Sequence, residues 1–378
     1  INCGYLTPSH FIPLAAPGVV AKGLRWMFDR KSPLYIKPRA NRELIKWLWD
    51  FYRSSNSAHV ERTQAYLLDL NLQSRDLYQQ IAAEEKLEFQ FNRKGLLILA
   101  QTKKGLEEER HLSEVANRLG LKTRMLSRKE VRQLEPDLLP DVLGACFYPE
   151  DGHIHPADFM GQMKNLLAQS GVNFHWGTAV QDLKIQDSRV VSIETASKSF
   201  LCDEVLLAAG SWSAYLARKV GLDMPLQGGK GYSMTLSNPP KNLRHPAILT
   251  EKKIAMTPFT NGLRIGGTME FAGLDTSINT TRVEAIKAGT QAFFPEIRDE
   301  WLDDVKIDRG LRPVSPDGMP YIGRVSSIHN LTVASGHAML GMSMGPISGK
   351  LIAEVLSGQK MPDQFELLNP NRFSRSKV

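Results

Sequence analysis

A buried strand that leads into a glycine-rich turn and then into a helix constrains the fold of this chain most strongly. The apolar run Leu331–Ala334 predicts the strand, Gly336 and Gly341 mark the turn, and a helix is expected from about residue 343 or 345 to residue 356. Such a turn points backbone N–H groups and the positive end of a helix towards whatever lies above it. The stretch therefore indicates either a site for an anion or a tight turn whose glycines permit close packing.

Strands and helices alternate along the rest of the chain, which predicts a mixed α+β and α/β protein of two domains. Helices are expected at residues 42–85 (two helices), 105–119, 157–169 and 282–294, and Ser127 with Glu130 forms a capping-box pattern. Strands are expected at residues 87–91, 96–99, 172–176, 182–185, 190–194 and 205–209 and within 234–271. Frequent prolines and glycines predict irregular backbone over residues 1–40.

The charges and cysteines exclude several classes of function. Lys and Arg number 47 against 40 Asp and Glu, and acids are interspersed with bases, so the surface is mildly basic without the clusters that nucleic-acid binding requires. No stretch approaches the roughly 18 apolar residues of a spanning helix, which leaves only peripheral contact with a membrane. Three widely spaced cysteines without a CxxC pair argue against a disulfide framework and favour a reducing compartment, the cytoplasm.

A second informative stretch, Gly310–Gly323, contains three prolines that stiffen a loop around Arg312. A guanidinium can bind a carboxylate through two parallel hydrogen bonds. Arg312 is therefore a candidate anchor for a substrate carboxylate. The alternative is a structural ion pair between Arg312 and a nearby acid such as Asp317.

Six motifs taken together resemble the FAD-dependent D-amino acid dehydrogenases, which belong to the group of glycine oxidase, D-amino acid oxidase and sarcosine oxidase. The motifs are Asn2–Gly4, Glu204–Ser213, Gly229–Ser233, Gly266–Asp275, Gly310–Pro313 and Gly336–His337. They follow one another in the order found in that family, so the resemblance covers nearly the whole chain. Each motif alone is weak, and their combination is specific.

The resemblance implies an FAD cofactor and the residues that contact it. Asn2, Cys3 and Gly4 would lie against the isoalloxazine, Val180 on the adenine side, Ala209, Gly210 and Trp212 along the cofactor, and Gly336, His337, Leu340, Gly341 and Met342 beneath the flavin pyrimidine. It also assigns the substrate carboxylate to Arg312. The FAD domain would comprise residues 1–10, 150–220 and 310–365, and a mixed-sheet substrate domain would comprise residues 41–149 and 221–309.

The chain departs from the family pattern at two places. The family begins with a βαβ unit that carries GxGxxG, and this chain has no GxGxxG near its start, so we expect a truncated FAD domain that lacks its first βαβ unit. At the turn, glycine oxidases resemble His-x-Arg-Asn-Gly, whereas this chain has His337-Ala338-Met339-Leu340-Gly341. The second difference favours the dehydrogenases over the oxidases.

Several other residues carry chemistry without a clear partner. His153 and His155 are expected to be surface histidines beside a turn, and no metal site is predicted because no third ligand of suitable spacing is evident. Tyr232 is a candidate catalytic residue that faces the substrate, with packing in a strand as the alternative. Cys3 is assigned as a small apolar contact to the flavin and not as a nucleophile, since no base is identifiable nearby.

Given the resemblance, the predicted function is oxidative deamination of D-amino acids, with D-proline and D-hydroxyproline as specific candidates, by hydride transfer from Cα to flavin N5. The electrons are expected to pass to a quinone or another acceptor, with peripheral contact at the inner face of a membrane. Two alternatives stay open. One is an oxidase that releases hydrogen peroxide, and the other is a non-catalytic fragment or subunit that needs a partner chain to bind FAD.

Overall fold

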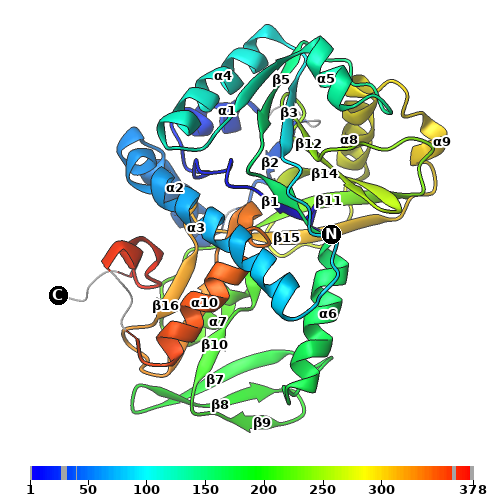
Figure 1. Ribbon diagram of the computed structural model, residues 1–378. Helices are drawn as coiled ribbons and strands as arrows, with labels where there is room; N and C mark the ends of the chain where they lie inside the picture. The colour runs from blue at the N-terminus through cyan, green and yellow to red at the C-terminus, as the bar shows by residue number, and fades with distance from the viewer. Residues whose placement is uncertain (1, 27–31, 40, 360–362, 375–378) are drawn as a thin grey trace.

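A large mixed sheet fills the upper half of the computed structural model, which describes residues 2–26, 32–39, 41–359 and 363–374 (Figure 1). Within these residues its nine strands run in the order β15-β11-β14-β13-β12-β3-β5-β4, with β2 paired to β14. The strands are β2 (Leu34–Ile36), β3 (Leu96–Ala100), β4 (Arg124–Ser127), β5 (Gly144–Tyr148), β11 (Gln227–Ser237), β12 (Ala247–Leu249), β13 (Ile254–Phe259), β14 (Gly262–Phe271) and β15 (Ile307–Val314). Only the pairs β3–β12 and β2–β14 are parallel among those strands.

Alternating apolar residues on one face of this sheet form the largest core of the protein. Met234 of β11 and Ile265 of β14 are fully buried there against Ile286 and Phe293 of helix α8 (Thr280–Phe293). Because side chains alternate between the two faces of a strand, the intervening residues of β11 and β14 point the other way. One face of the sheet therefore belongs to the core, and the other is available for a site.

A small sheet lies in the lower half of the view and has the order β10-β17-β16 (Figure 1). Strand β10 (Val205–Leu207) runs parallel to β17 (Leu331–Ser335), and β16 (Tyr321–Arg324) is antiparallel to β17. Leu331 and Val333 pack towards helix α7 (Ser213–Lys219), whereas Ala334 faces the cluster of helix α10 (Gly345–Leu356). The small sheet is thus a middle layer between helices, as the apolar run Leu331–Ala334 predicts.

The remaining elements surround these two sheets. The helices are α1 (Val19–Trp26), α2 (Arg42–Ser54), α3 (Ser57–Glu84), α4 (Lys103–Arg118), α5 (Arg128–Leu134), α6 (Pro156–Gln169) and α9 (Asp299–Leu302), with 3₁₀ turns η1 (Gly210–Trp212), η2 (Ala338–Leu340) and η3 (Asp363–Leu368). Strands β1 (Tyr5–Leu6) and β6 (Gly152–His153) pair with each other, and β7 (Val180–Gln186), β8 (Arg189–Thr195) and β9 (Ser199–Leu201) form a separate sheet. None of the helices among the described residues has the length and apolarity needed to cross a membrane.

Most of the expected elements are present, and three expectations are wrong. Residues 1–40 are not irregular throughout, because they contain β1, α1 and β2. Residues 87–91 form no strand, since Gln90 has a φ of 54°, which interrupts an extended backbone. Residues 172–176 form no strand either and are exposed, so their alternating pattern has no sheet partner there. The capping box of Ser127 and Glu130 is confirmed.

Packing between distant segments shapes the division into domains. Leu67 and Leu70 of α3 are buried against Ile347 and Leu351 of α10, so α3 packs beside the small sheet. Residues 310–314 lie in β15 of the large sheet. Helical periodicity shows that a face is apolar but not which partner covers it, so the domain boundaries stay a prediction.

Candidate active site

Two glycine turns lie side by side at the carboxyl ends of β10 and β17. The two strands are parallel, with Leu207 opposite Val333, so both leave the sheet at the same edge. Ser335 Oγ donates a hydrogen bond to the Gly210 carbonyl oxygen at 3.0 Å and ties one turn to the other. Gly336 has a φ of 83°, and a Cβ there would lie 2.7 Å from the Tyr321 ring. The structure thus brings the predicted residues of both turns together.

The turn after β17 is fixed to the start of α10. His337 Nε2 lies 2.8 Å from Ser348 Oγ, and that hydroxyl donates to the Met344 carbonyl, so the imidazole N–H is the donor in the first of these bonds. Burial lowers the pKa of His337 to about 4, which keeps the ring neutral. Leu340, Gly341 and Met342 follow in the same turn. His337 therefore holds the turn and carries no charge near neutral pH.

The N-terminal segment lies between the large sheet and this turn. Thr257 Oγ1 donates to the Cys3 carbonyl at 2.7 Å, and Arg264 Nη1 donates to the Asn2 carbonyl at 2.8 Å. Thr7 N donates to Ser343 Oγ at 2.9 Å, which attaches the segment to the turn before α10. Gly4 has a φ of 77°, and a Cβ there would be 2.0 Å from the Ile154 carbonyl oxygen, so only glycine fits.

Arg312 on β15 is held by backbone and not by an acid. Its Nη1 donates to the Thr268 carbonyl at 2.9 Å, and it forms no ion pair among the residues that the structure describes. Asp317, the acid considered as its partner, instead accepts two hydrogen bonds from Arg372, at 2.7 and 2.9 Å. The pairing of Arg312 with Asp317 is therefore excluded. Burial lowers the pKa of Arg312, as expected for a cation without a carboxylate beside it.

Arg312 lies next to both the N-terminal segment and the turn after β17. The Cys3 thiol interacts electrostatically with Arg312, and burial raises the pKa of that thiol so that it stays protonated. Val314, two residues from Arg312 and on the same face of β15, forms a β-bridge with His337. The candidate anchor, the segment Asn2–Gly4 and the glycine turn thus surround one region of the molecule.

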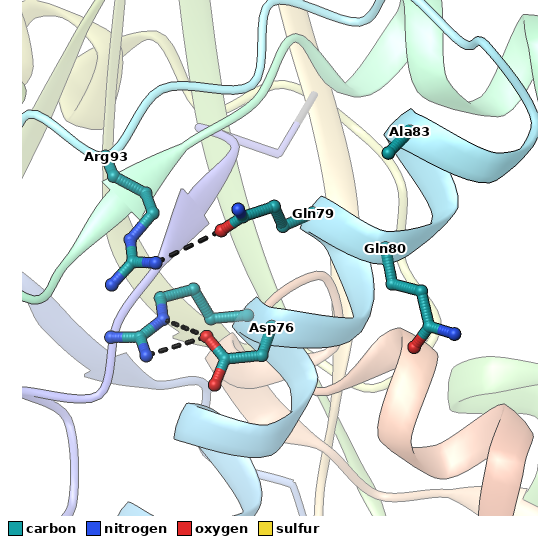
Figure 2. Close-up of a pocket in the computed structure, with 6 residues that line it drawn as sticks. Asp76, Gln79, Gln80, Ala83 and Arg93 are labelled. Atoms are coloured by element: carbon teal, nitrogen blue, oxygen red, sulfur yellow. Dashed lines mark hydrogen bonds and ion pairs between the residues drawn. The ribbon is translucent and has the colours of Figure 1, made fainter.

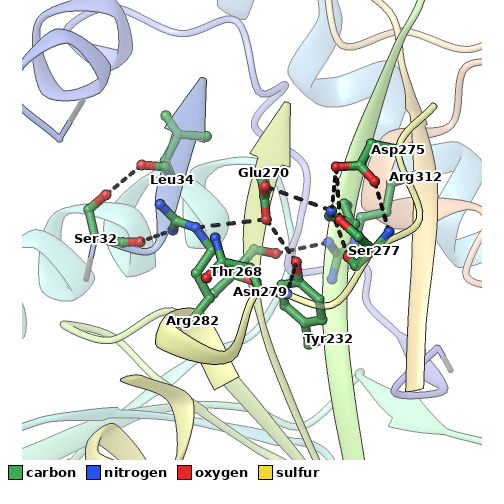
Figure 3. Close-up of polar contacts among 11 residues, drawn as sticks. Ser32, Leu34, Tyr232, Thr268, Glu270, Asp275, Ser277, Asn279, Arg282 and Arg312 are labelled. Atoms are coloured by element: carbon green, nitrogen blue, oxygen red, sulfur yellow. Dashed lines mark hydrogen bonds and ion pairs between the residues drawn. The ribbon is translucent and has the colours of Figure 1, made fainter. Parts of the chain in front are cut away.

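Tyr232 points to the opposite face of the large sheet. Its neighbour Gly231 faces the Arg312 guanidinium, and successive residues of a strand alternate between faces. Tyr232 Oη donates to Glu270 Oε2 at 2.8 Å and accepts from Asn279 N at 3.2 Å (Figure 3). Burial raises the pKa of the phenol. The structure does not bring Tyr232 to Arg312 and favours the packing interpretation.

A buried charge network around Glu270 was missed in the sequence. Glu270 lies 3.7 Å from Lys230 Nζ and 3.8 Å from Arg282 Nε, and all three side chains are at most 5% exposed (Figure 3). Lys230 also donates to the Ser277 carbonyl at 2.8 Å. A pocket of about 370 Å³ opens beside Glu270 and Asn279. Two sequence features could have indicated this network. Lys230 stands between two glycines and Glu270 follows Gly267, so each is a charged residue in an otherwise apolar or glycine-rich strand.

Of the other predicted residues, one group belongs to the two glycine turns and two residues lie elsewhere. Ala209, Gly210 and Trp212 lie in the turn after β10, and Trp212 is 48% exposed. Val180 begins β7, in the separate sheet, and no hydrogen bond or ring contact of the described residues links it to either turn. His153 is buried opposite Tyr5, so its assignment as a surface histidine is wrong. The pairing of β1 with β6 buries it, which its own sequence neighbours do not reveal.

His155 has a structural role at the start of α6. Its Nδ1 accepts from Asp158 N at 3.4 Å and lies 2.8 Å from an Asp158 carboxylate oxygen. It therefore caps the helix.

A groove on α3 is separate from this site. It has a volume of about 560 Å³ and is lined by Arg75, Asp76, Gln79, Gln80, Ala83 and Arg93 (Figure 2). Its charges are satisfied internally, since Arg75 pairs with Asp76 and with Glu150 at 2.7 Å, and Arg93 donates to Gln79 at 3.1 Å. No residue that lines it belongs to the region around Arg312, so it is not part of the candidate active site.

Comparison with known proteins places the whole arrangement in one family. The family described as "FAD dependent oxidoreductase" (DAO) matches residues 33–355. A D-amino acid dehydrogenase from Neisseria meningitidis is 29% identical over 379 residues, which cover 98% of this chain and 90% of that protein. A glycine oxidase from Bacillus cereus has a TM-score of 0.71 at 25% identity, over 79% of this chain and 84% of its own.

A second solved structure shares the fold alone. The L-proline dehydrogenase from P. horikoshii has a TM-score of 0.70 at 19% identity, and the match covers 82% of this chain and 84% of that one. Since the family's match extends over most of the sequence, the chain belongs to the DAO family of FAD-dependent oxidoreductases.

Proposed function

We propose that this oxidoreductase acts on D-amino acids and that Arg312 binds the substrate carboxylate. The observation that carries the proposal is a guanidinium anchored to a backbone carbonyl with no acid paired to it among the described residues. A carboxylate that enters would find the remaining N–H donors of the fork free to bind it. The 29% identity with a D-amino acid dehydrogenase supports the choice of substrate class.

The residues at the ends of β10 and β17 fit a bound FAD. A Cβ on Gly210 would meet no atom within 4 Å, so the backbone there faces open space. The buried hydroxyls of Ser211 and Ser213 have no hydrogen-bond partner among the described residues, and buried polar groups normally have one. We propose that the turns Ala209–Trp212 and Gly336–Met342, with Asn2–Gly4, hold the cofactor, and that Val180 contacts its adenine side.

The turns Ala209–Trp212 and Gly336–Met342 would hold FAD, and the bound cofactor would supply the hydride-accepting chemistry for oxidation at the substrate Cα. The side chains of this chain have simpler tasks. Arg312 fixes the carboxylate and thereby orients the Cα–H bond. The N-terminal end of α10 behind the turn favours negative charge above it. Neutral His337 and the protonated thiol of Cys3 add no charge that opposes this effect.

No general base is needed when the substrate amino group is neutral, because its lone pair assists the departure of the hydride. The imine product would hydrolyse to a 2-oxo acid and ammonia, or stay cyclic when the substrate is D-proline or D-hydroxyproline. We propose a quinone-type acceptor at a membrane surface for the electrons. The sequence His337–Gly341, which departs from the His-x-Arg-Asn-Gly of glycine oxidases, supports a dehydrogenase.

The test is anaerobic reduction of the FAD-loaded chain. D-amino acids, with D-proline and D-hydroxyproline among them, should bleach the visible flavin bands, whereas the L-enantiomers should not. Re-oxidation by a quinone analogue without hydrogen peroxide would support the dehydrogenase, and peroxide release in air would support the oxidase. A chain that cannot be loaded with FAD would support the alternative in which a partner chain completes the site.

A further inference from the structure

Helix α2 has a second apolar face that nothing among the described residues covers. Trp47 and Phe51 are buried on the inner face, whereas Ile45, Trp49 and Tyr52 on the outer face are 62%, 59% and 61% exposed. Residues 45, 49 and 52 are spaced by four and three, so they form one continuous stripe along the helix. In Figure 1, α2 lies at the left edge of the molecule. We call Ile45, Trp49 and Tyr52 the α2 stripe.

The charges beside the α2 stripe are positive. Arg42 and Arg53 are exposed at helical spacing from Ile45 and Trp49, and neither has an ion-pair partner among the described residues. The two acids of the helix lie on its flank and are neutralised, Glu43 by Arg218 at 2.9 Å and Asp50 by Lys46 at 2.8 Å. The outer face of α2 therefore combines aromatic side chains with two cations and no uncompensated carboxylate.

We infer that the α2 stripe docks on the surface of an anionic lipid bilayer. Trp and Tyr prefer the boundary between headgroups and hydrocarbon, where the ring is buried and its polar atom stays hydrated. Arg42 and Arg53 would meet anionic headgroups, and their long stems allow the charge to remain at the interface. A helix of 13 residues is about 20 Å long, so α2 lies in the interface and does not cross it.

The docking face is rigidly connected to the candidate active site. On the inner face of α2, Trp47 Nε1 donates to the Val314 carbonyl at 2.9 Å, and its ring lies 5.1 Å from that of Phe271. Val314 is on β15, two residues from Arg312. A bilayer that binds α2 would therefore hold the site at a fixed distance from the membrane. That role rests on the proposed membrane acceptor, whereas binding itself does not.

The first experiment measures co-sedimentation with vesicles of phosphatidylcholine, with and without phosphatidylglycerol, and needs no turnover. The chain should bind the anionic vesicles at low salt, and binding should weaken as salt screens the charges. Replacing Trp49 and Tyr52 together by Ser should reduce the partition coefficient at least tenfold. The control is Trp176→Ser, since Trp176 is 72% exposed but lies outside α2, and it should bind as the unchanged chain does.

A second pair of variants tests the charges. Arg42→Gln and Arg53→Gln should each lower partition about fivefold, the ratio that corresponds to about 1 kcal/mol for one cation at an anionic surface. Lys129→Gln on α5 removes an exposed charge elsewhere and should leave partition unchanged. Absence of binding to anionic vesicles, or equal losses in the controls, would overturn the inference. So would a dimer in sedimentation velocity that the Trp49/Tyr52 variant dissociates, because a second copy would then cover the stripe.

Because flavin reduction by D-amino acids is measured in solution, the two proposals fail independently. Binding to vesicles without flavin reduction would support the docking surface and contradict the proposed function. Flavin reduction without binding to anionic vesicles would support the proposed function and contradict the docking surface.

Discussion

The guanidinium of Arg312 occupies the space where residue 231 would place a side chain. A Cβ on Gly231 would lie 2.2 Å from Arg312 Nη1 and 2.4 Å from Nη2, closer than real atoms approach. β11 and β15 are neighbours in the sheet, and Gly231 faces Gly310 across the ladder. A glycine on one strand thus creates room for the candidate anchor on the next, and the position of Arg312 depends on both.

Gly231→Ala should therefore displace Arg312 and weaken substrate binding. We expect the KM for D-amino acids to rise about tenfold, which corresponds to about 1.4 kcal/mol. Overpacking should also lower the unfolding free energy by roughly 1–3 kcal/mol. Steady-state kinetics and urea unfolding measure the two effects. Gly161→Ala on α6, where a Cβ would meet nothing, is the control and should leave KM unchanged. An unchanged KM in Gly231→Ala would show that the position of Arg312 does not depend on Gly231.

Tyr232→Phe should affect stability and leave substrate binding intact. The variant removes the donor to Glu270 and the acceptor for Asn279 N, which costs about 1–3 kcal/mol when buried groups lose their partner. Denaturant unfolding and flavin-reduction kinetics separate the two roles. The exposed Tyr215 gives a matched control, since Tyr215→Phe should change neither. A large fall in the rate of flavin reduction without loss of stability would restore Tyr232 as a catalytic residue.

Glu270→Gln should destabilise the fold by about 3 kcal/mol, because it leaves the buried cation of Lys230 with weaker compensation. Lys230 keeps the Ser277 carbonyl and Asp275 at 3.5 Å, so the loss is expected near the low end for a broken buried pair. The readout is the urea midpoint at constant slope. Glu284→Gln, on an exposed position of α8, is the control. Equal stability of the two variants would show that the network contributes little.

The buried carboxyl of Glu109 predicts a pH dependence of stability. Burial raises its pKa to about 7. Between about pH 4.5 and 7 the unfolded chain has released this proton while the folded chain keeps it, so the contribution of Glu109 to the unfolding free energy should fall with rising pH, by about 3 kcal/mol, and level off above 7. Buried Asp151, whose pKa burial also raises to about 7, contributes to the same pH range, so Glu109→Gln should remove only the Glu109 part of the dependence. The exposed Glu114→Gln should leave the profile of the unchanged chain as it is. Parallel pH profiles of both variants would contradict the assignment.

Local patterns explain what could be predicted from sequence. The strand Leu331–Ser335, the turn at Gly336 and helix α10 follow from an apolar run, glycines and helical spacing within 30 residues. The alternation at residues 87–91 failed because one left-handed residue, Gln90, interrupts the extended backbone without changing the hydrophobic pattern. Arg312 could be selected as a candidate anchor because prolines and an arginine stand close together in the chain.

Contacts between distant residues explain what could not be predicted. Tyr232 and Glu270 are 38 positions apart, and the face to which each points depends on how β11 pairs with β14, including the register shift between Lys230 and Tyr232. Asp317 accepts a hydrogen bond from Arg372, which lies 55 positions away in the chain. The α2 stripe could not be predicted, because its spacing is that of any amphipathic helix. Only the structure shows which of the two apolar faces of α2 is covered.

The most direct test of the central claim pairs a change in the protein with a change in the ligand. Anaerobic flavin reduction is measured with D-proline and with D-prolinol, which lacks the carboxylate, in the unchanged chain and in Arg312→Ala. Arg309→Ala, an exposed arginine of the same strand, is the control. We predict a strong preference for D-proline over D-prolinol in the unchanged chain and in the control. Arg312→Ala should lose that preference, by about the 2–5 kcal/mol that truncation of one member of a buried charge pair costs. A preference for D-proline that persists in Arg312→Ala would contradict the assignment of Arg312 as the carboxylate anchor.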